Sequence, residues 1–258
     1  MKDPTIKTVI DIGSYDGADT AYFLECGFHV VAVEANRELA DSMRRRFQAQ
    51  IASGQLTCIN AAISPNGETV ELVISGIDLG SSSIFVDRIA ERGRIGKMTV
   101  AGVTLQQLFE KYGVPDYLKV DIEGADRLCV LSLTADTRPM FLSFEVGDDV
   151  EELLAHLSTI GFRQFKIINQ HSFRELAEQQ CYWFERGSHW LMRCLGYQGP
   201  LKVRRAGRFF VIERSSGTPP WKSDGLWRSV EETRVRLREA KASGALRYWY
   251  DIHATTDW

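Results

Sequence analysis

A tight turn between a predicted strand and a predicted helix carries the first residues suited to chemistry. The stretch Val9–Gly17 (VIDIGSYDG) ends an apolar run on Asp11 and has glycines at positions 13 and 17. Glycine lets a backbone approach a ligand closely, because it has no side chain to stand in the way. Glu34 follows 23 residues after Asp11, at the end of a second apolar run. A carboxylate there can accept hydrogen bonds from the two hydroxyls of a ribose, so the spacing predicts a nucleoside site.

The residues of this turn favour one cofactor over another. A dinucleotide-binding turn has three glycines, which admit a pyrophosphate. Here Ser14, Tyr15 and Asp16 interrupt the glycines, and the acids add negative charge where a diphosphate would lie. Such charge suits the sulfonium and ammonium of S-adenosylmethionine better than NAD; a strand–helix turn without a ligand is the alternative. The predicted cofactor-binding residues are Asp11, Gly13, Ser14, Tyr15, Gly17, Thr20, Glu34, Ala35, Asn60, Ala61 and Asp121. In this set, the Asn60 side chain or a neighbouring backbone amide would pair with the adenine edge.

Alternating strands and helices must position these residues. Apolar runs and flanking turn residues predict strands at 8–12, 29–34, 56–60, 117–121, 140–145, 162–168 and 208–213. Capping residues and glycines predict helices at 19–26, 36–53, 105–112, 125–133, 149–160 and 230–243. Capping boxes are expected at Thr104 with Gln107 and at Ser229 with Glu232, and Asp148 with Glu151 is expected to open a helix.

This alternation predicts an α/β protein with a Rossmann-like, mostly parallel sheet that has helices on both faces. Ligands of such sheets bind beyond the carboxyl ends of the strands. We expect a cofactor-binding core over residues 1–170. Residues 171–258 are expected to add a helical and aromatic cap that faces the acceptor, the last strand of the sheet and a C-terminal helix, within the same domain.

Composition and charge are those of an ordinary globular chain. The chain has 258 residues, of which 44% are hydrophobic and 25% charged, and no apolar run is long enough to span a membrane. Residues 1–160 carry a formal charge of −10 and residues 161–258 carry +7. This asymmetry suggests an anionic partner or a solvated arginine-rich surface. Five cysteines without paired spacing and a start without an apolar signal segment predict reduced thiols and a cytoplasmic protein.

Several segments together resemble one enzyme family. VIDIGSYDGADT, VVAVEAN, INAAIS, GSSSIF, TLQQLFEKYGVPDYLKVDIEGAD and FLSFEV, in this order, resemble the FkbM family of class I S-adenosylmethionine-dependent methyltransferases over about residues 8–170. The resemblance implies a seven-stranded methyltransferase fold and O-methylation of a sugar or another small hydroxylated acceptor. The chain departs from the family's usual Asn-bearing glycine turn, which puts the contacts of Tyr15 and Asp16 in question.

Acids near two strand ends are the expected catalytic groups. Asp121 and Glu123 follow the fourth predicted strand, and Glu145 ends the fifth. Crowded carboxylates can raise the pKa of one of them and make it a general base for a hydroxyl acceptor. Alternatively, Asp121 and Glu145 bind a divalent metal ion that contacts the acceptor oxygen. We favour the base without a metal. Asp121 has the further candidate role of holding the ammonium of the cofactor.

Other residues are candidates for contact with the acceptor. His171 follows the sixth predicted strand and is a candidate base. His253 can pair with Asp251, unless the C-terminal segment is an exposed tail. The serines at 81–83 are candidate hydrogen-bond donors, and the aromatic residues of 173–197 are a candidate lid over a sugar.

The leading hypothesis is thus an O-methyltransferase for a hydroxyl of a sugar, glycan or related small metabolite. A nucleic-acid methyltransferase is the second hypothesis, because the rear of the chain is basic, although no Asn-Pro-Pro-Tyr motif and no Pro-Cys pair is present. A binding protein without catalytic activity is the third.

Overall fold

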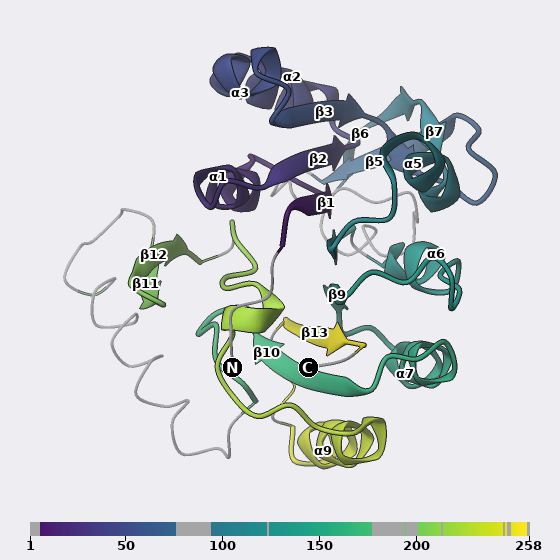
Figure 1. Cartoon of the computed structure of the whole chain (residues 1–258), viewed down its shortest axis with the longest axis vertical. Helices are drawn as coiled ribbons and strands as arrows, with labels where there is room; N and C mark the ends of the chain where they lie inside the picture. Colours follow the sequence, from purple (N-terminus) through teal and green to yellow (C-terminus); the bar gives the residue numbers. More distant parts are fainter. Residues whose placement is uncertain are drawn as a thin grey trace.

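A seven-stranded sheet is the centre of the computed structural model, which describes residues 6–75, 94–122, 124–176, 194, 201–212, 214–244, 246 and 249–256. Its strands are β1 (Thr8–Ile12), β2 (His29–Glu34), β3 (Leu56–Asn60), β8 (Tyr117–Val120), β9 (Phe141–Glu145), β10 (Gln164–Asn169) and β13 (Tyr250–Thr255). They lie in the order β10-β13-β9-β8-β1-β2-β3 (Figure 1). Only β13 runs antiparallel to its neighbours, so the prediction of a mostly parallel sheet is confirmed.

The predicted last strand of this sheet is wrong. Among the described residues of 208–212, Arg208–Val211 forms a strand, β12, and it pairs with β11 (Lys202–Arg205) in a separate hairpin. Ala206 and Gly207 have φ values of +46° and +80°, as a two-residue hairpin turn requires. The last strand of the main sheet is β13, which the sequence analysis treated as a possible exposed tail. All six residues of β13 are buried, but its sequence includes Asp251, His253 and Thr255, and these polar residues make it resemble an exposed segment.

Helices cover both faces of the sheet, as predicted (Figure 1). The residues of α5 (Leu105–Tyr112), α6 (Asp126–Val130), α7 (Val150–Thr159) and α9 (Val230–Ala242) pack on one face. The opposite face is covered by α1 (Ala18–Glu25), α2 (Arg37–Arg46), β12 and the 3-10 helix η2 (Pro220–Lys222). Side chains alternate along β1, so Ile10 and Ile12 join the first layer, while Val9 joins the second and Asp11 shares its face.

Three helix predictions need correction. The helix expected over 36–53 is divided at Phe47 into α2 and α3 (Gln48–Ala52), because Phe47 leaves helical geometry at φ −110° and ψ 30°. Helix α7 begins after Asp149, without the side-chain cap expected from Asp148. Helix α6 is shorter than predicted. The capping boxes at Thr104 and Ser229 are confirmed.

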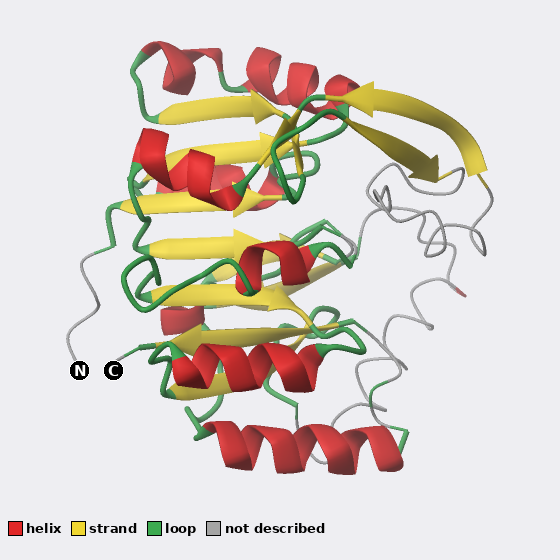
Figure 2. Cartoon of the chain, turned by 90° about the vertical axis from the view of Figure 1, so that its right-hand side faces the viewer, coloured by secondary structure: helices red, strands yellow, loops and turns green. Residues whose placement is uncertain are grey.

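The carboxyl ends of the parallel strands share one edge of the sheet. At this edge the short strands β4 (Ala62–Ile63) and β7 (Gly102–Val103) pair, and β5 (Val70–Ser75) pairs with β6 (Arg94–Val100). Figure 2 shows the β5–β6 hairpin projecting beyond the strand ends, whereas β1 begins and β13 ends at the opposite edge. Among the described residues, no helix is long and apolar enough to cross a bilayer.

A row of buried polar residues crosses the sheet on the face of α1 and η2. The strand registers place Asp11 opposite Lys119, Lys119 opposite Ser143, Ser143 opposite His253, and His253 opposite Lys166. All five are buried. Buried polar groups need partners, and residues 220–223, a segment far along the chain, supply partners to Lys166 and His253.

Candidate active site

The conformation of the glycine turn after β1 is fixed by close contacts with neighbouring parts of the protein. Gly13, Tyr15 and Gly17 all have positive φ values, of +79°, +49° and +77°. A Cβ on Gly13 would lie 1.8 Å from the backbone oxygen of Asp121. A Cβ on Gly17 would lie 2.9 Å from Met43 Sδ. The sequence analysis expected these glycines to admit a ligand, but the neighbouring atoms show that both are also required for close packing of the protein.

Glu34 is held at the end of β2 by two backbone groups. Tyr15 N–H donates to Oε2 at 2.8 Å, and Asn36 N–H donates to Oε1 at 2.7 Å. Each carboxylate oxygen can accept a second hydrogen bond, so both remain suitable acceptors for ribose hydroxyls. Burial raises the pKa of Glu34 to about 7, although these two backbone bonds lower it.

Asn60 and Ala61 use their amide hydrogens within the protein. Asn60 Nδ2 donates to the carbonyl oxygens of Glu34 and Ala35, each at 2.9 Å. Ala61 N–H donates to the Glu34 oxygen at 3.2 Å. These bonds join the ends of β2 and β3, so pairing with an adenine edge is left to other groups, such as Asn60 Oδ1.

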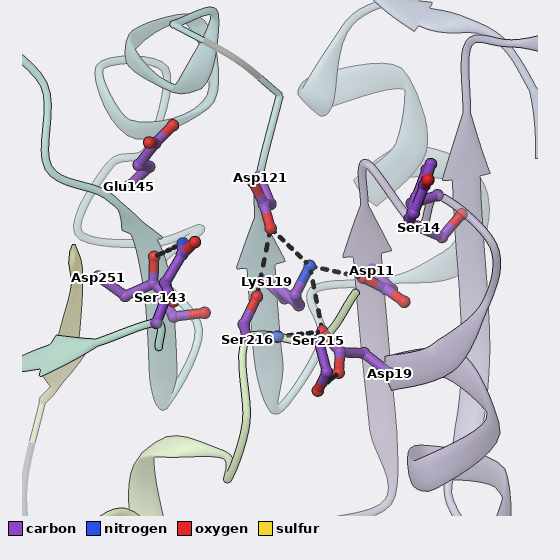
Figure 3. Close-up of polar contacts among 12 residues, drawn as sticks. Asp11, Ser14, Asp19, Lys119, Asp121, Ser143, Glu145, Ser215, Ser216 and Asp251 are labelled. Carbon is purple, nitrogen blue, oxygen red and sulfur yellow. Dashed lines mark hydrogen bonds and ion pairs between the residues drawn. The ribbon is translucent and has the colours of Figure 1, made fainter. Parts of the chain in front are cut away.

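Lys119 is a functional-site residue that the sequence analysis missed. Its Nζ lies 3.4 Å from Asp11 Oδ1, 3.6 Å from Asp19 Oδ2 and 3.4 Å from Asp121 Oδ2 (Figure 3). Burial by itself lowers the pKa of Lys119, but the three carboxylates raise it well above its ordinary value. The signal was available: a lysine inside the apolar strand YLKV is an exception that demands a buried counter-ion.

The acids around Lys119 differ in exposure, and therefore in what they can bind. Asp11 is fully buried, and Thr20 donates to its Oδ2 at 2.7 Å. Asp19 is buried too, and this burial raises its pKa against the opposing effect of Lys119. The Asp121 side chain, by contrast, is 34% exposed. Asp121 is thus the acid of this group that can meet a ligand directly, whereas Asp11 and Thr20 would act through Lys119 and packing.

A distant segment completes this cluster. Ser216 Oγ donates to Asp121 Oδ2 at 3.2 Å, and Ser216 N–H donates to Asp19 Oδ2 at 3.0 Å. Ser215 Oγ also donates to Asp19. Arg214 forms an ion pair with Asp16 of the glycine turn at 3.3 Å. Sequence reasoning gave these residues no role in the site, because nothing local reveals contacts across about 100 to 200 positions.

A second group of acids lies at the ends of β8 and β9. Glu145 N–H donates to Asp126 Oδ1 at 3.4 Å, and Glu145 lies opposite Asp251 in the strand register. Asp251 accepts a hydrogen bond from Gln170 at 2.6 Å. Burial, reinforced by the charge of Asp121, raises the pKa of Asp126 to about 7 and that of Asp251 well above its ordinary value. Glu145 itself is only partly buried, at the next strand end along from Asp121 (Figure 3).

The two candidate histidines, His253 and His171, lie in different surroundings. His253 does not pair with Asp251: its Nδ1 lies 3.1 Å from Ser223 Oγ, and burial lowers its pKa to about 3. His171 follows β10 and packs against Trp249, with 5.9 Å between ring centroids. Strands lie about 4.8 Å apart, so β10 is roughly 14 Å from β8. The structure therefore does not bring His171 beside Asp121, and its role as a base stays a prediction.

Some predicted residues lie outside the described part of the chain. They are Glu123, the serines at 81–83 and most aromatic residues of 173–197. Within the described ranges, no cluster of three or more His, Cys, Asp and Glu side chains could hold a metal ion. A cleft of about 740 Å³ runs beside the edge strand β3 and is lined by Arg44, Cys58, Asn60, Lys111 and Tyr112, among others. Of the predicted cofactor residues, only Asn60 lines this cleft.

A seven-stranded sheet of this order, with a glycine turn after β1 and acids at the neighbouring strand ends, defines a class I S-adenosylmethionine-dependent methyltransferase. Residues 11–168 match the family described as the methyltransferase FkbM domain, and the chain belongs to this family. The resemblance noted in the sequence is thereby confirmed, as is S-adenosylmethionine as the cofactor.

Individual relatives are more distant. The chain is 32% identical over 88 residues to a probable ribosomal RNA small subunit methyltransferase A of Methanospirillum hungatei, a match that covers 34% of this chain and 34% of that protein. The chain thus aligns with about a third of the length of this relative. A methyltransferase FkbM structure from Methylobacillus flagellatus has 14% identity and a TM-score of 0.41, covering 59% of this chain and 37% of the other. A predicted O-methyltransferase, Atu636, from Agrobacterium tumefaciens has 14% identity and a TM-score of 0.36, covering 65% and 67%.

The charge of the cluster agrees with this cofactor. Three carboxylates surround one ammonium group, so the cluster stays negative even when Asp19 carries a proton. A group of side chains with net negative charge attracts a cationic ligand and repels a diphosphate. The described residues therefore fit S-adenosylmethionine better than NAD.

Proposed function

We propose that this protein is an O-methyltransferase that acts on a hydroxyl group of a sugar, glycan or related small metabolite. The observation that supports this proposal best is the pair of accessible carboxylates, Asp121 and Glu145, at adjacent strand ends beside the cofactor half of the sheet. One can hold the cofactor while its neighbour meets the acceptor. The coarser activity, methyl transfer from S-adenosylmethionine, follows from the family.

We assign the cofactor half of the site to the ends of β1, β2 and β8. S-adenosylmethionine, when bound, supplies a methyl group that is already activated on a sulfonium. Glu34 would accept hydrogen bonds from the ribose, and Asp121 would hold the ammonium of the methionine moiety. The chain's task is then to orient the acceptor and to exclude water, which can lower a barrier by roughly 7–11 kcal/mol.

We assign the acceptor half to the ends of β8, β9 and β10. Glu145 is the first candidate for the general base, because it is accessible and lies next to Asp121 in the sheet. The buried acids Asp126 and Asp251 lie beside it, and negative charge on either of them would favour proton uptake by Glu145. Trp249, 40% exposed immediately before β13, and His171 beside it offer aromatic rings that can contact the apolar face of a sugar ring.

A methyl-transfer screen tests this proposal. The full chain is incubated with methyl-labelled S-adenosylmethionine and with nucleotide sugars, free glycans, lipid-linked glycans or RNA, with and without EDTA. We expect a methyl ether on a carbohydrate oxygen and no effect of EDTA. Label in RNA alone, or on nitrogen, would refute the proposal, and loss of activity in EDTA would favour the metal alternative with Asp121 and Glu145.

Substitution of Glu145 tests the base. Glu145→Gln should lower kcat about 100-fold or more while S-adenosylmethionine still binds, because a positioned base contributes at least that much. Glu152→Gln on α7, an exposed glutamate paired with Arg127, is the control and should leave kcat unchanged. If Glu145→Gln stays active and His171→Gln does not, the base is His171.

RNA is the second candidate acceptor, because the curated relative is a probable ribosomal RNA methyltransferase. An anionic acceptor would also suit the +7 charge of residues 161–258. However, three acids of residues 1–160 offset part of this charge through ion pairs: Arg208–Glu25, Arg214–Asp16, and Glu151 with both Arg234 and Arg238. We therefore rank neutral and anionic sugars ahead of RNA.

We also propose a cytoplasmic location, which cell fractionation would test.

A further inference from the structure

The turn formed by Arg214–Gly217 is the part of the C-terminal region that reaches the cofactor end of the sheet. It follows β12, and its contacts end on acids of three elements: Asp16 in the glycine turn, Asp19 in α1 and Asp121 after β8. Figure 3 shows Ser216 and Ser215 on one side of the Lys119 cluster, with Ser216 directed at Asp121. A segment remote in sequence thus supplies hydrogen bonds to groups that the family core places around the cofactor.

The contacts of Asp121 are concentrated on one of its two oxygens. Lys119 Nζ and Ser216 Oγ both approach Oδ2, at 3.4 Å and 3.2 Å. Two donors from different directions restrict the rotation of a carboxylate group. They also leave Oδ1 as the oxygen that this partly exposed side chain can offer to a ligand.

Packing keeps Ser216 in place. Gly217 has a φ of +85°, and a Cβ on it would lie 2.4 Å from Phe173 Cδ1. Phe173 is fully buried, so the turn is seated against the core. Gly217 N–H donates to Ser215 Oγ at 3.0 Å, and Ser216 N–H is bound to Asp19. The hydroxyl of Ser216 is therefore pre-positioned by a rigid turn.

We propose that Ser216 is a positioning residue for the cofactor: it fixes Asp121 so that Oδ1 binds the ammonium of the methionine moiety. This inference rests on the place given to Asp121 under the proposed function. It also implies that docking of the 214–217 turn and binding of the amino-acid end of the cofactor stabilise each other, because both depend on one orientation of Asp121.

Two ligands that differ at the amino-acid end test this role. S-adenosylhomocysteine carries the ammonium, whereas 5′-methylthioadenosine has the same nucleoside without it. We expect Ser216→Ala to weaken S-adenosylhomocysteine about 3- to 10-fold by calorimetry, since water replaces only part of a hydrogen bond to a charged group. Binding of 5′-methylthioadenosine should stay unchanged. Ser216→Thr, which keeps the hydroxyl, should restore most of the loss.

Ser223→Ala is the matched control. Ser223 is 8% exposed and Ser216 9%, and both lie in the same C-terminal segment. Ser223 contacts Lys166 and His253 instead of the acids, so its loss should leave the affinity ratio of the two ligands unchanged.

The results that would overturn the role of Ser216 differ from the result that would overturn the cofactor site. Equal weakening of both ligands by Ser216→Ala, or no weakening of either, overturns the positioning role. If Ser216→Ala does not fold, Ser216→Cys gives the same comparison, because it keeps the volume but donates only weakly. If the wild-type chain binds neither S-adenosylhomocysteine nor S-adenosylmethionine, the assignment of the cofactor site itself is wrong.

Discussion

At the scale of single residues, the cofactor end of the sheet depends on one buried cation. Lys119 Nζ lies within 3.6 Å of three carboxylates and is 4% exposed. Without this cation, Asp11 and Asp19 would be buried charges with no ionic partner among these groups. Ion pairs with Lys119 therefore connect β1, α1 and the end of β8, in addition to their apolar packing.

Removal of the charge of Lys119 should destabilise the fold strongly. We expect Lys119→Met to lower the free energy of unfolding by about 3–5 kcal/mol, because it leaves buried carboxylates without their partner. Urea denaturation measures this loss. Lys111→Met on α5 is the control, since an exposed lysine should change stability by less than about 0.5 kcal/mol. Equal effects of the two substitutions would show that Lys119 is not the counter-ion.

Glu34 should make stability depend on pH with a defined sign. Burial raises its pKa from 4.5 in the unfolded chain to about 7 in the folded protein. The folded state thus binds more protons between these values, and its stability falls as pH rises from about 4.5 to 7. Glu34→Gln should remove this contribution, on the order of 3 kcal/mol across the interval. Parallel stability curves for the two proteins, measured by denaturation at several pH values, would contradict the shift.

At the scale of elements, the glycine turn after β1 packs directly against the backbone that follows β8. Its apolar run and glycine spacing were readable from the sequence, as were six of the seven strands of the sheet. The close contact between Gly13 and the Asp121 backbone was not predictable from the sequence, because it depends on the order of the strands in the sheet. Strand β13 was missed for a related reason: Asp251 and His253 break the apolar pattern, and their partners, Gln170 and Ser223, lie far away in the sequence.

Gly13→Ala should therefore cost much more than substitution of another glycine with positive φ. The new Cβ would lie 1.8 Å from the Asp121 backbone oxygen, so strand β8 must move, and we expect a loss of about 3 kcal/mol or more in unfolding free energy. Gly27→Ala has a similar φ of +85° but nothing within 4 Å. It should cost only the conformational strain, about 1 kcal/mol. Similar losses, measured by urea denaturation, would contradict the close approach.

At the scale of the whole molecule, the described part of the C-terminal region contributes side chains to the candidate site. Residues 215–223 bind Asp19 and Asp121, the partners of Lys119 near one end of the polar row that crosses the sheet, and Lys166 and His253 at its other end. The sequence predicted a C-terminal region that adds a strand to the sheet. It did not predict which strand, or that serines of this region bind the acids of the core, because such contacts depend on the three-dimensional path of the chain.

We place S-adenosylmethionine at the ends of β1, β2 and β8 because the acids there outnumber their buried cation, Lys119. Calorimetric titration of the wild-type chain with S-adenosylmethionine and, separately, with NAD tests this most directly. We predict one binding site for S-adenosylmethionine and no binding of NAD, since Asp11, Asp16 and Asp121 repel a diphosphate. Binding of NAD without binding of S-adenosylmethionine would contradict the account.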